Sequence, residues 1–107
     1  DLQFMLNIEI GNLTLGSAAC CQTKDSLDGA ELGQVNSYAI GIKWVSPSGE
    51  LMEASEDKNP ALLPFIRASY GLAGIVYEVT FQLKPLEIIS FNYDVHDVED
   101  LKDSTIK

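Results

Sequence analysis

The sequence is poor in basic residues. Lys and Arg make up 7 of its 107 residues and Asp and Glu 16, so the formal net charge is −9. Domains that bind nucleic acid or anionic membrane surfaces need a basic face, and this balance argues against both partners. No apolar run approaches the roughly 20 residues of a membrane span, and the N-terminal basic residues of a signal peptide are absent.

Histidine and cysteine are also scarce. His96 is the single histidine, and Cys20 and Cys21 are the two cysteines. This leaves no cluster with metal-ligand spacing, no disulfide framework and no histidine beside a nucleophile motif. A disulfide between adjacent cysteines strains the peptide that joins them. We therefore expect reduced thiols that pack as small apolar residues in a cytoplasmic protein. Thiol redox chemistry through the pair is the alternative.

The common nucleotide-binding motifs are missing as well. The sequence has neither the G-x-G-x-x-G fingerprint nor a P-loop. The segment 71–74, Gly-Leu-Ala-Gly, resembles them only in glycine content and is typical of a helix end followed by a strand. We interpret the acidic residues of 50–57 as a solvated edge rather than as paired catalytic carboxylates.

What the sequence does contain is a set of alternating apolar runs. They predict strands over 4–10, 37–45, 50–54, 74–83 and 89–95. Ser46-Pro47-Ser48-Gly49 has the composition of a tight turn, so 37–54 is expected to form a hairpin.

Helix signals are fewer. Asn59 and Pro60 predict an N-cap and first helical residue, with the helix running to Ser69 and stopping at Gly71. Pro64 removes one hydrogen bond there, so the helix could instead begin at Pro64. Asp97 is a candidate cap for a second helix. One domain is expected, of α+β class: a mainly antiparallel sheet of four to five strands flanked by one or two helices.

Residues 14–26 are nearly all small and show no strong helical or strand period. Such a segment lets the backbone approach another backbone or a ligand closely. It is the most unusual feature that the residues alone provide.

Four segments in order resemble a known family. They are Thr23–Ser26, Gly33–Ser37, the hairpin Gly41–Glu50, and Arg67–Thr80. Together they resemble the second half of the FAD-binding domain in the vanillyl-alcohol oxidase and p-cresol methylhydroxylase superfamily, with most likeness to its lactone and alditol oxidase branch. The likeness runs from about Leu13 to Leu86. It identifies the chain as a piece of an FAD-linked oxidase with a PCMH-type domain.

The resemblance implies which residues contact the cofactor. The segment 15–26 would face the flavin and pyrophosphate, 33–37 would line the cofactor, and 74–76 would meet the adenosine end. The implied cofactor-binding residues are Gly16, Ser17, Ala18, Thr23, Lys24, Ser26, Gly33, Val35, Ser37, Gly74, Ile75 and Val76. Lys24 either faces the pyrophosphate or balances Asp25. Backbone N–H groups are able to hold phosphate without side-chain cations, which suits a chain of net charge −9.

The resemblance also implies the setting. Residues 1–91 would be the second-subdomain portion of the FAD-binding domain, and 92–107 the start of the substrate domain. The parent protein would be a flavin-dependent oxidoreductase that passes a hydride from a hydroxylated small molecule to non-covalently bound FAD. A fragment that begins at Asp1 would lack the first subdomain and the catalytic base, so we expect it to bind FAD weakly or not at all.

Two further expectations concern partners. The face that meets FAD would be partly apolar in an isolated fragment, which predicts self-association. The alternative function is a non-catalytic α+β interaction or dimerisation module without flavin.

Overall fold

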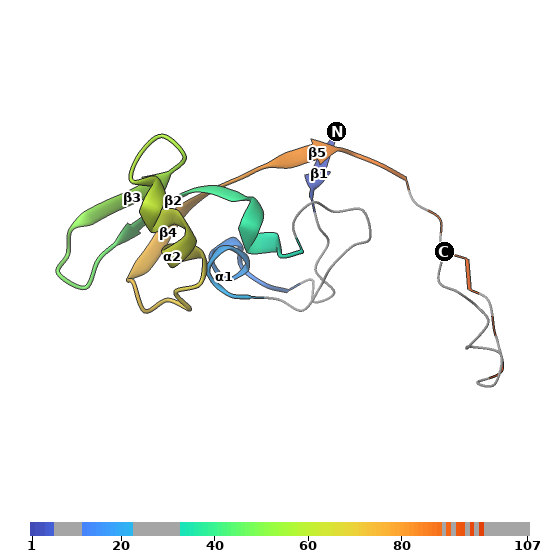
Figure 1. The fold of residues 1–107 in the computed structure, drawn as a ribbon, viewed down its shortest axis with the longest axis horizontal. Coiled ribbons are helices and arrows are strands. Elements are labelled where there is room, and N and C mark those ends of the chain that lie inside the picture. The colour runs from blue at the N-terminus through green and yellow to red at the C-terminus, as the bar shows by residue number, and fades with distance from the viewer. Residues whose placement is uncertain are drawn as a thin grey trace.

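The computed structural model describes residues 1–5, 12–22, 33–88, 90, 92, 93, 95 and 97. Over these residues the fold is α+β, as predicted, with antiparallel strands and short helices (Figure 1). The strands are β1 (Leu2–Phe4), β2 (Ala39–Val45), β3 (Leu51–Ser55), β4 (Ile75–Phe81) and β5 (Leu83–Pro85). The α-helices are α1 (Leu15–Cys20) and α2 (Leu63–Arg67), and the 3₁₀-helices are η1 (Val35–Tyr38) and η2 (Pro60–Leu62).

The predicted hairpin is confirmed, but its first strand begins at Ala39 and not at residue 37, because Ser37 and Tyr38 belong to η1. Strands β2 and β3 pair antiparallel, with Gly41 opposite Ser55 and Val45 opposite Leu51. The turn between them closes with a bond from the Gly49 N–H to the Ser46 carbonyl at 2.9 Å. Gly49 has a φ of +84°, which explains the glycine at this position. Strand β2 is central, since β4 pairs with its other edge in the order β3-β2-β4.

Strand β4 is present where the alternation predicts it. The odd-numbered residues face the core at one end of the strand and the even-numbered residues face it at the other end. The predicted apolar face joined Ile75 and Tyr77 to Val79 and Phe81. In the structure Val76, Val79 and Phe81 pack on the core, while Ile75 is 76% exposed. The register explains this, because Lys43 lies opposite Glu78 and the next residue, Trp44, lies opposite Val76. Tyr77 is thus the extra residue of a β-bulge, which moves the residues before it to the other face.

The sheet is divided rather than continuous. After Gln82 the chain continues as β5, which pairs antiparallel with β1, so the described strands form one sheet of three strands and another of two. The predicted strand 4–10 is wrong at its start, because β1 begins at Leu2; residues 6–10 lie outside the described residues. Of the predicted strand 89–95, residues 90, 92, 93 and 95 are described and belong to no strand. The helix expected after Asp97 lies outside the described residues.

The predicted helix over 60–69 is two short helices. Pro60 begins η2, and Pro64 is the second residue of α2, where its missing N–H costs nothing. Asn59 is not the side-chain cap that we expected. It adopts a φ of 51°, and its side-chain amide donates to the Glu53 carbonyl at 2.9 Å instead. Helix α2 ends at Arg67, four residues before Gly71.

The core lies between the three-stranded sheet and the two α-helices. From the sheet come Ala39, Ile42, Trp44 and Ala54, from α1 Ala19 and Cys20, and from α2 Leu63 and Ile66. Arg67 ties α2 to the start of β2, since its Nε and Nη2 donate to the Ala39 carbonyl at 2.9 and 2.6 Å. Burial lowers the pKa of Arg67, an effect that nearby Glu56 opposes. Helix α1 packs on the same side of the sheet as α2, because its Ala19 and Cys20 belong to this core.

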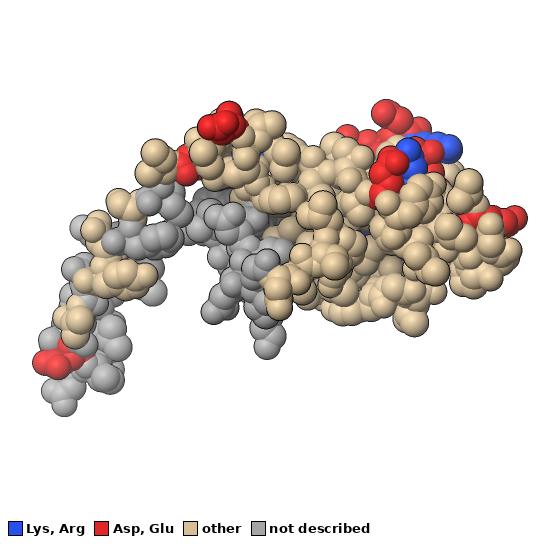
Figure 2. All heavy atoms as spheres, turned by 180° about the vertical axis from the view of Figure 1, so that it is seen from behind, with Lys and Arg blue, Asp and Glu red and all other residues tan. Residues whose placement is uncertain are grey.

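The opposite face of the sheet carries ion pairs and, near the hairpin turn, the exposed apolar side chains of Leu51 and Ile75. Lys43 on β2 pairs with Glu78 on β4 at 2.6 Å, and Lys58 pairs with Glu53 on β3 at 2.6 Å. Figure 2 shows basic side chains beside acidic ones at the end of the molecule that carries the three-stranded sheet. The expected solvated acidic edge is confirmed at Glu50, Glu56 and Asp57, which are exposed. Among the described residues, no helix has the length and apolar character to cross a membrane.

Candidate functional site

Within the small-residue segment, Leu15–Cys20 form helix α1 although the segment shows no strong helical period; residues 23–26 lie outside the described residues. Thr14 caps α1, because its Oγ1 accepts a hydrogen bond from the Ser17 N–H at 3.1 Å. The Ala18 N–H then donates to the Thr14 carbonyl at 2.9 Å and the Cys21 N–H to the Ser17 carbonyl at 3.0 Å. The sequence signal was present in Thr14 followed by alanines, but periodicity is weak in a helix of six residues.

A tight turn faces this helix. Tyr70 and Gly71 have φ values of 50° and 82°, and the Leu72 N–H donates to the Ser69 carbonyl at 2.9 Å. Two successive positive φ angles define a type I′ turn. The Tyr70 N–H donates to the Cys20 carbonyl at 3.0 Å, so this turn is bonded directly to the end of α1.

Asn36 of η1 holds the helix ends together from the other side. It is 6% exposed, and its Nδ2 donates to the carbonyl of Cys21 at 3.2 Å and to that of Arg67 at 2.9 Å. These carbonyls belong to the last turn of α2 and to the cap of α1, and neither has its own helical donor. Asn36 was not among the residues predicted from the sequence, because a buried amide leaves no periodic signal.

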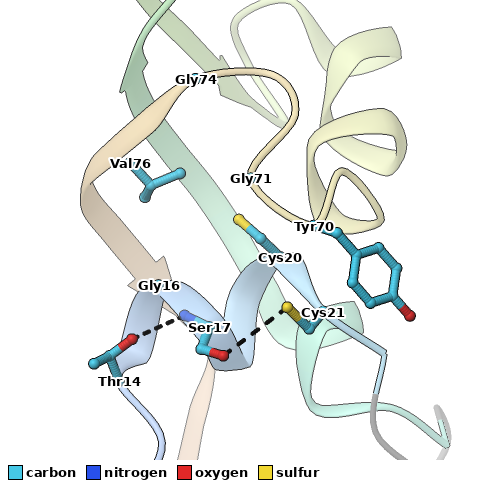
Figure 3. A pocket seen from close by; sticks show the side chains of 9 residues that line it. All are labelled: Thr14, Gly16, Ser17, Cys20, Cys21, Tyr70, Gly71, Gly74 and Val76. Atoms are coloured by element: carbon cyan, nitrogen blue, oxygen red, sulfur yellow. Dashed lines mark hydrogen bonds between the residues drawn. The ribbon is translucent and has the colours of Figure 1, made fainter.

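A cleft of about 300 Å³ lies between α1 and the chain that enters β4 (Figure 3). Its lining residues are Thr14, Gly16, Ser17, Cys20, Cys21, Tyr70, Gly71, Gly74 and Val76. The lining is uncharged and consists of small side chains, hydroxyls, two thiols and one aromatic ring. In Figure 3 the Cys20 side chain points from α1 toward the turn at Gly71. A neutral, open cleft of this kind suits part of a larger ligand rather than a free ion.

Gly74 is required by the backbone on the far wall. Its φ is +136°, and a Cβ built there would lie 2.0 Å from the Val45 carbonyl oxygen. The atoms that this Cβ would meet belong to the backbone of Val45 and Ser46, so no change of side-chain rotamer relieves the clash. The close approach lets β4 enter the sheet beside the hairpin turn, so packing alone explains this glycine.

The two thiols differ in environment. Cys20 is 4% exposed, and burial raises the pKa of its thiol above 9.0, although the Ser69 hydroxyl nearby acts in the opposite direction. Ser69 Oγ is itself buried, and no hydrogen bond of regular geometry reaches it in the described part of the chain, so its contact with the Cys20 thiol is a weak one. Cys21 is half-buried, and the Ser17 hydroxyl donates to its Sγ at 3.9 Å. Both cysteines are free thiols, as expected, but only Cys20 is a fully buried one.

The residues implied by the resemblance fall into four groups. Gly16, Ser17, Gly74 and Val76 line the cleft, although they come from distant parts of the sequence. Ala18 and Val35 are buried together against Tyr38, so they serve packing. Gly33, Ser37 and Ile75 lie outside the cleft lining, and Gly33 and Ile75 are exposed. Thr23, Lys24 and Ser26 lie outside the described residues.

The cleft also contains residues that the sequence reasoning missed. Thr14, Tyr70 and Gly71 line it, and Tyr70 accepts a bond at its hydroxyl from the Gln22 N–H at 3.4 Å. Tyr70 is 58% exposed and carries the positive φ of a turn position that favours glycine or asparagine. That conflict between residue type and turn position was the signal that could have singled it out.

Comparison with known proteins gives a partial relationship. The chain is 35% identical over 75 residues to the mitochondrial L-galactono-1,4-lactone dehydrogenase of Brassica oleracea, which is 69% of this chain and 12% of that protein. It is 32% identical over 75 residues to the mitochondrial enzyme of the same name from Arabidopsis thaliana, with the same coverage. No family model matches the chain, and no solved structure matches it. The chain thus spans 12% of the length of these curated relatives, and the similarity supports a relationship with the FAD-linked oxidases, to which they belong.

Proposed function

We propose that this chain is part of the FAD-binding region of a flavin-dependent oxidoreductase, and that the cleft between α1 and the turn at Gly71 takes one portion of the cofactor. Two observations support the proposal. The similarity to L-galactono-1,4-lactone dehydrogenases covers 69% of the chain. Gly16, Ser17, Gly74 and Val76, which the family resemblance assigns to the cofactor, all line this cleft.

Gly16 is the observation that carries the proposal. A Cβ at this position would meet only Thr14 Oγ1, at 4.0 Å, so neither sterics nor a positive φ requires glycine. Within a helix alanine is more stable than glycine by about 0.5–1 kcal/mol. The glycine thus makes the helix less stable and keeps the cleft open. This is what a site needs when a ring or phosphate group must come close to the helix backbone.

The rest of the lining fits a neutral contact with FAD. The Thr14 hydroxyl, which accepts from the Ser17 N–H, keeps its proton for a ligand, the Ser17 hydroxyl would exchange its long 3.9 Å bond to Cys21 Sγ for one, and Val76 gives an apolar contact on the opposite wall. When bound, FAD would supply the hydride-accepting chemistry. The part of this chain is to bind and orient the cofactor, and the buried Cys20 gives the cleft a wall that continues into the core. The volume of about 300 Å³ is at the low end for ligand sites, so a single moiety of FAD is the expected occupant.

The finer assignments belong to the same proposal. Residues 1–91 would form the second-subdomain portion of a PCMH-type domain, with 92–107 leading into the substrate domain. The substrate would be a hydroxylated small molecule, since the relatives are named for a sugar lactone. We also keep the cytoplasmic location and the non-covalent cofactor as predictions.

Titration of the chain with FAD, followed by NMR of its backbone amides, tests the proposal. We expect weak binding, with shifts gathered at Gly16, Ser17, Gly71 and Val76. Ser17→Leu fills the cleft and should abolish these shifts. Ser90→Leu is the matched control, because Ser90 is exposed and lies in no helix or strand. Parallel titrations with ADP and with riboflavin identify which half of FAD enters the cleft.

The outcomes separate the two candidate functions. Shifts that are absent at millimolar FAD, or equal in the two leucine variants, overturn the assignment of the cleft. The non-catalytic module without flavin predicts this result. Gly16→Ala provides a second check, since it should raise the stability of α1 and still weaken binding. An unchanged FAD affinity in Gly16→Ala would show that the open position has no role in the site.

A further inference from the structure

We propose that the outer edge of the long strand formed by β4 and β5 pairs antiparallel with the same edge of a second copy of this chain. This inference is independent of flavin binding. Strand β2 pairs with β4 and β1 with β5, and in the described part of the chain no strand pairs with the other edge of β4 and β5. An unpaired strand edge is a template for pairing with another chain.

The direction of the backbone groups follows from two bonds. The Gln82 N–H donates to the Tyr38 carbonyl at 2.8 Å, and the Leu86 N–H to the Asp1 carbonyl at 3.2 Å. Because backbone groups alternate along a strand, the even-numbered residues of 78–86 face β2 and β1. Val79, Phe81 and Leu83 therefore direct their N–H and C=O groups to the free edge. Pro85, which has no N–H, is also oriented toward this edge, as prolines in edge strands are.

The sequence of this strand is complementary to itself in one antiparallel register. With Phe81 opposite Phe81 of the second copy, Glu78 of each chain lies opposite Lys84 of the other. Thr80 then lies opposite Gln82, and Val79 opposite Leu83, so polar residues share one face and apolar residues the other. Both charged pairs form at once because the two copies are related by a two-fold axis.

Side-chain exposure leaves the charged groups available. Glu78 is 52% exposed beside Lys43, and Lys84 is 23% exposed beside Glu87. Pairing the two edges would join these ion pairs into one network without removing either. Charge complementarity thus identifies a second copy as the occupant, since a partner of uniform charge would meet one like charge on this edge.

Amide hydrogen exchange measured across a concentration series tests the edge directly. We expect the Val79, Phe81 and Leu83 amides to become protected as concentration rises, in step with a doubling of the 11.7 kDa mass in sedimentation. The amides of Thr80 and Gln82 face β2 and should be protected at every concentration. A chain that stays monomeric, or a dimer in which the odd-numbered amides exchange freely, overturns the proposal.

Charge reversal tests the register. Lys84→Glu and Glu78→Lys each place two pairs of like charges across the two-fold axis, and each should raise the dissociation constant about tenfold or more. An equal mixture of the two variants restores both pairs and should form a heterodimer. Lys58→Glu is the matched control, because it makes the same charge change in the Glu53 pair away from this edge. Dimerisation unaffected by Lys84→Glu, or not recovered in the mixture, would exclude this register.

Discussion

Gly74 gives the sharpest test of how the cleft is built. A Cβ at this position would stand 2.0 Å from the Val45 oxygen, 2.9 Å from the Val45 carbonyl carbon and 3.1 Å from the Ser46 Cα. All three are backbone atoms of the hairpin, so Gly74→Ala must either displace β2 or move β4 away from it. The φ of +136° adds a conformational penalty of about 1–3 kcal/mol. We expect a total loss of more than about 3 kcal/mol in the free energy of unfolding.

Two other glycines separate the cost of the positive φ at Gly74 from the cost of its clash with the hairpin. Gly71 has a φ of +82°, and no atom lies within 4 Å of the point where a Cβ would stand, so Gly71→Ala should lose only about 1–2 kcal/mol. Gly16 has neither constraint, and Gly16→Ala should gain about 0.5–1 kcal/mol. The difference between the Gly74 and Gly71 variants isolates the clash with the hairpin.

Urea denaturation followed by tryptophan fluorescence measures all three variants. Trp44 is the single tryptophan, and it is buried in the core beside the affected strands. If the Gly74→Ala variant is already unfolded without urea, the substitution costs more than the whole free energy of unfolding of the chain, which agrees with the expectation. The reasoning fails if Gly74→Ala loses no more stability than Gly71→Ala, because the backbone clash would then be absent.

Four other substitutions or treatments test separate features. Asn36→Ala leaves two partly buried carbonyls without their donor and should lose about 1–3 kcal/mol in urea denaturation; a loss below about 0.5 kcal/mol would contradict the bridge. Arg67→Lys keeps the charge but loses the two-pronged bond to the Ala39 carbonyl, so its unfolding midpoint should fall. Iodoacetamide should alkylate Cys21 before Cys20 in the folded chain, as peptide mass spectrometry would detect; equal rates would contradict the burial of Cys20. Since burial raises the pKa of Cys20 above 9.0, this thiol stabilises the fold below pH 9.0 and loses that contribution as pH rises through the folded pKa, a dependence that Cys20→Ala should remove.

The sequence predicted where the strands lie better than it predicted which side of each strand is buried. The alternation over 74–83 correctly predicted β4, because seven residues of period two are unlike any helix. It placed Ile75 and Tyr77 on the core face, and this was wrong because a bulge at Tyr77 reverses the alternation. A bulge depends on how β2 and β4 pair, and the pairing of distant strands is not written in either strand alone.

The helix at the cleft was missed for a related reason. Helix α1 has six residues, which is too short for a hydrophobic period, and it is stabilised by the Thr14 cap and by packing of Ala19 and Cys20 on the sheet. Tertiary contacts thus decide a segment whose local preference is weak. The convergence of Ser17 with Val76 is likewise a product of the fold, since the sequence supplies both residues but not their proximity.

The three-residue segment 74–76 now separates into residues with different explanations. Gly74 is required by the Val45 carbonyl, and Ile75 is 76% exposed on the opposite face, which leaves Val76 as the residue that reaches the cleft. A loss of cofactor binding in Gly74→Ala would therefore report on folding rather than on contact. Gly16 is free of this ambiguity, because the helix would be more stable with alanine there. Evidence for a cofactor site thus has to come from the helix side of the cleft, where folding does not already explain the residues.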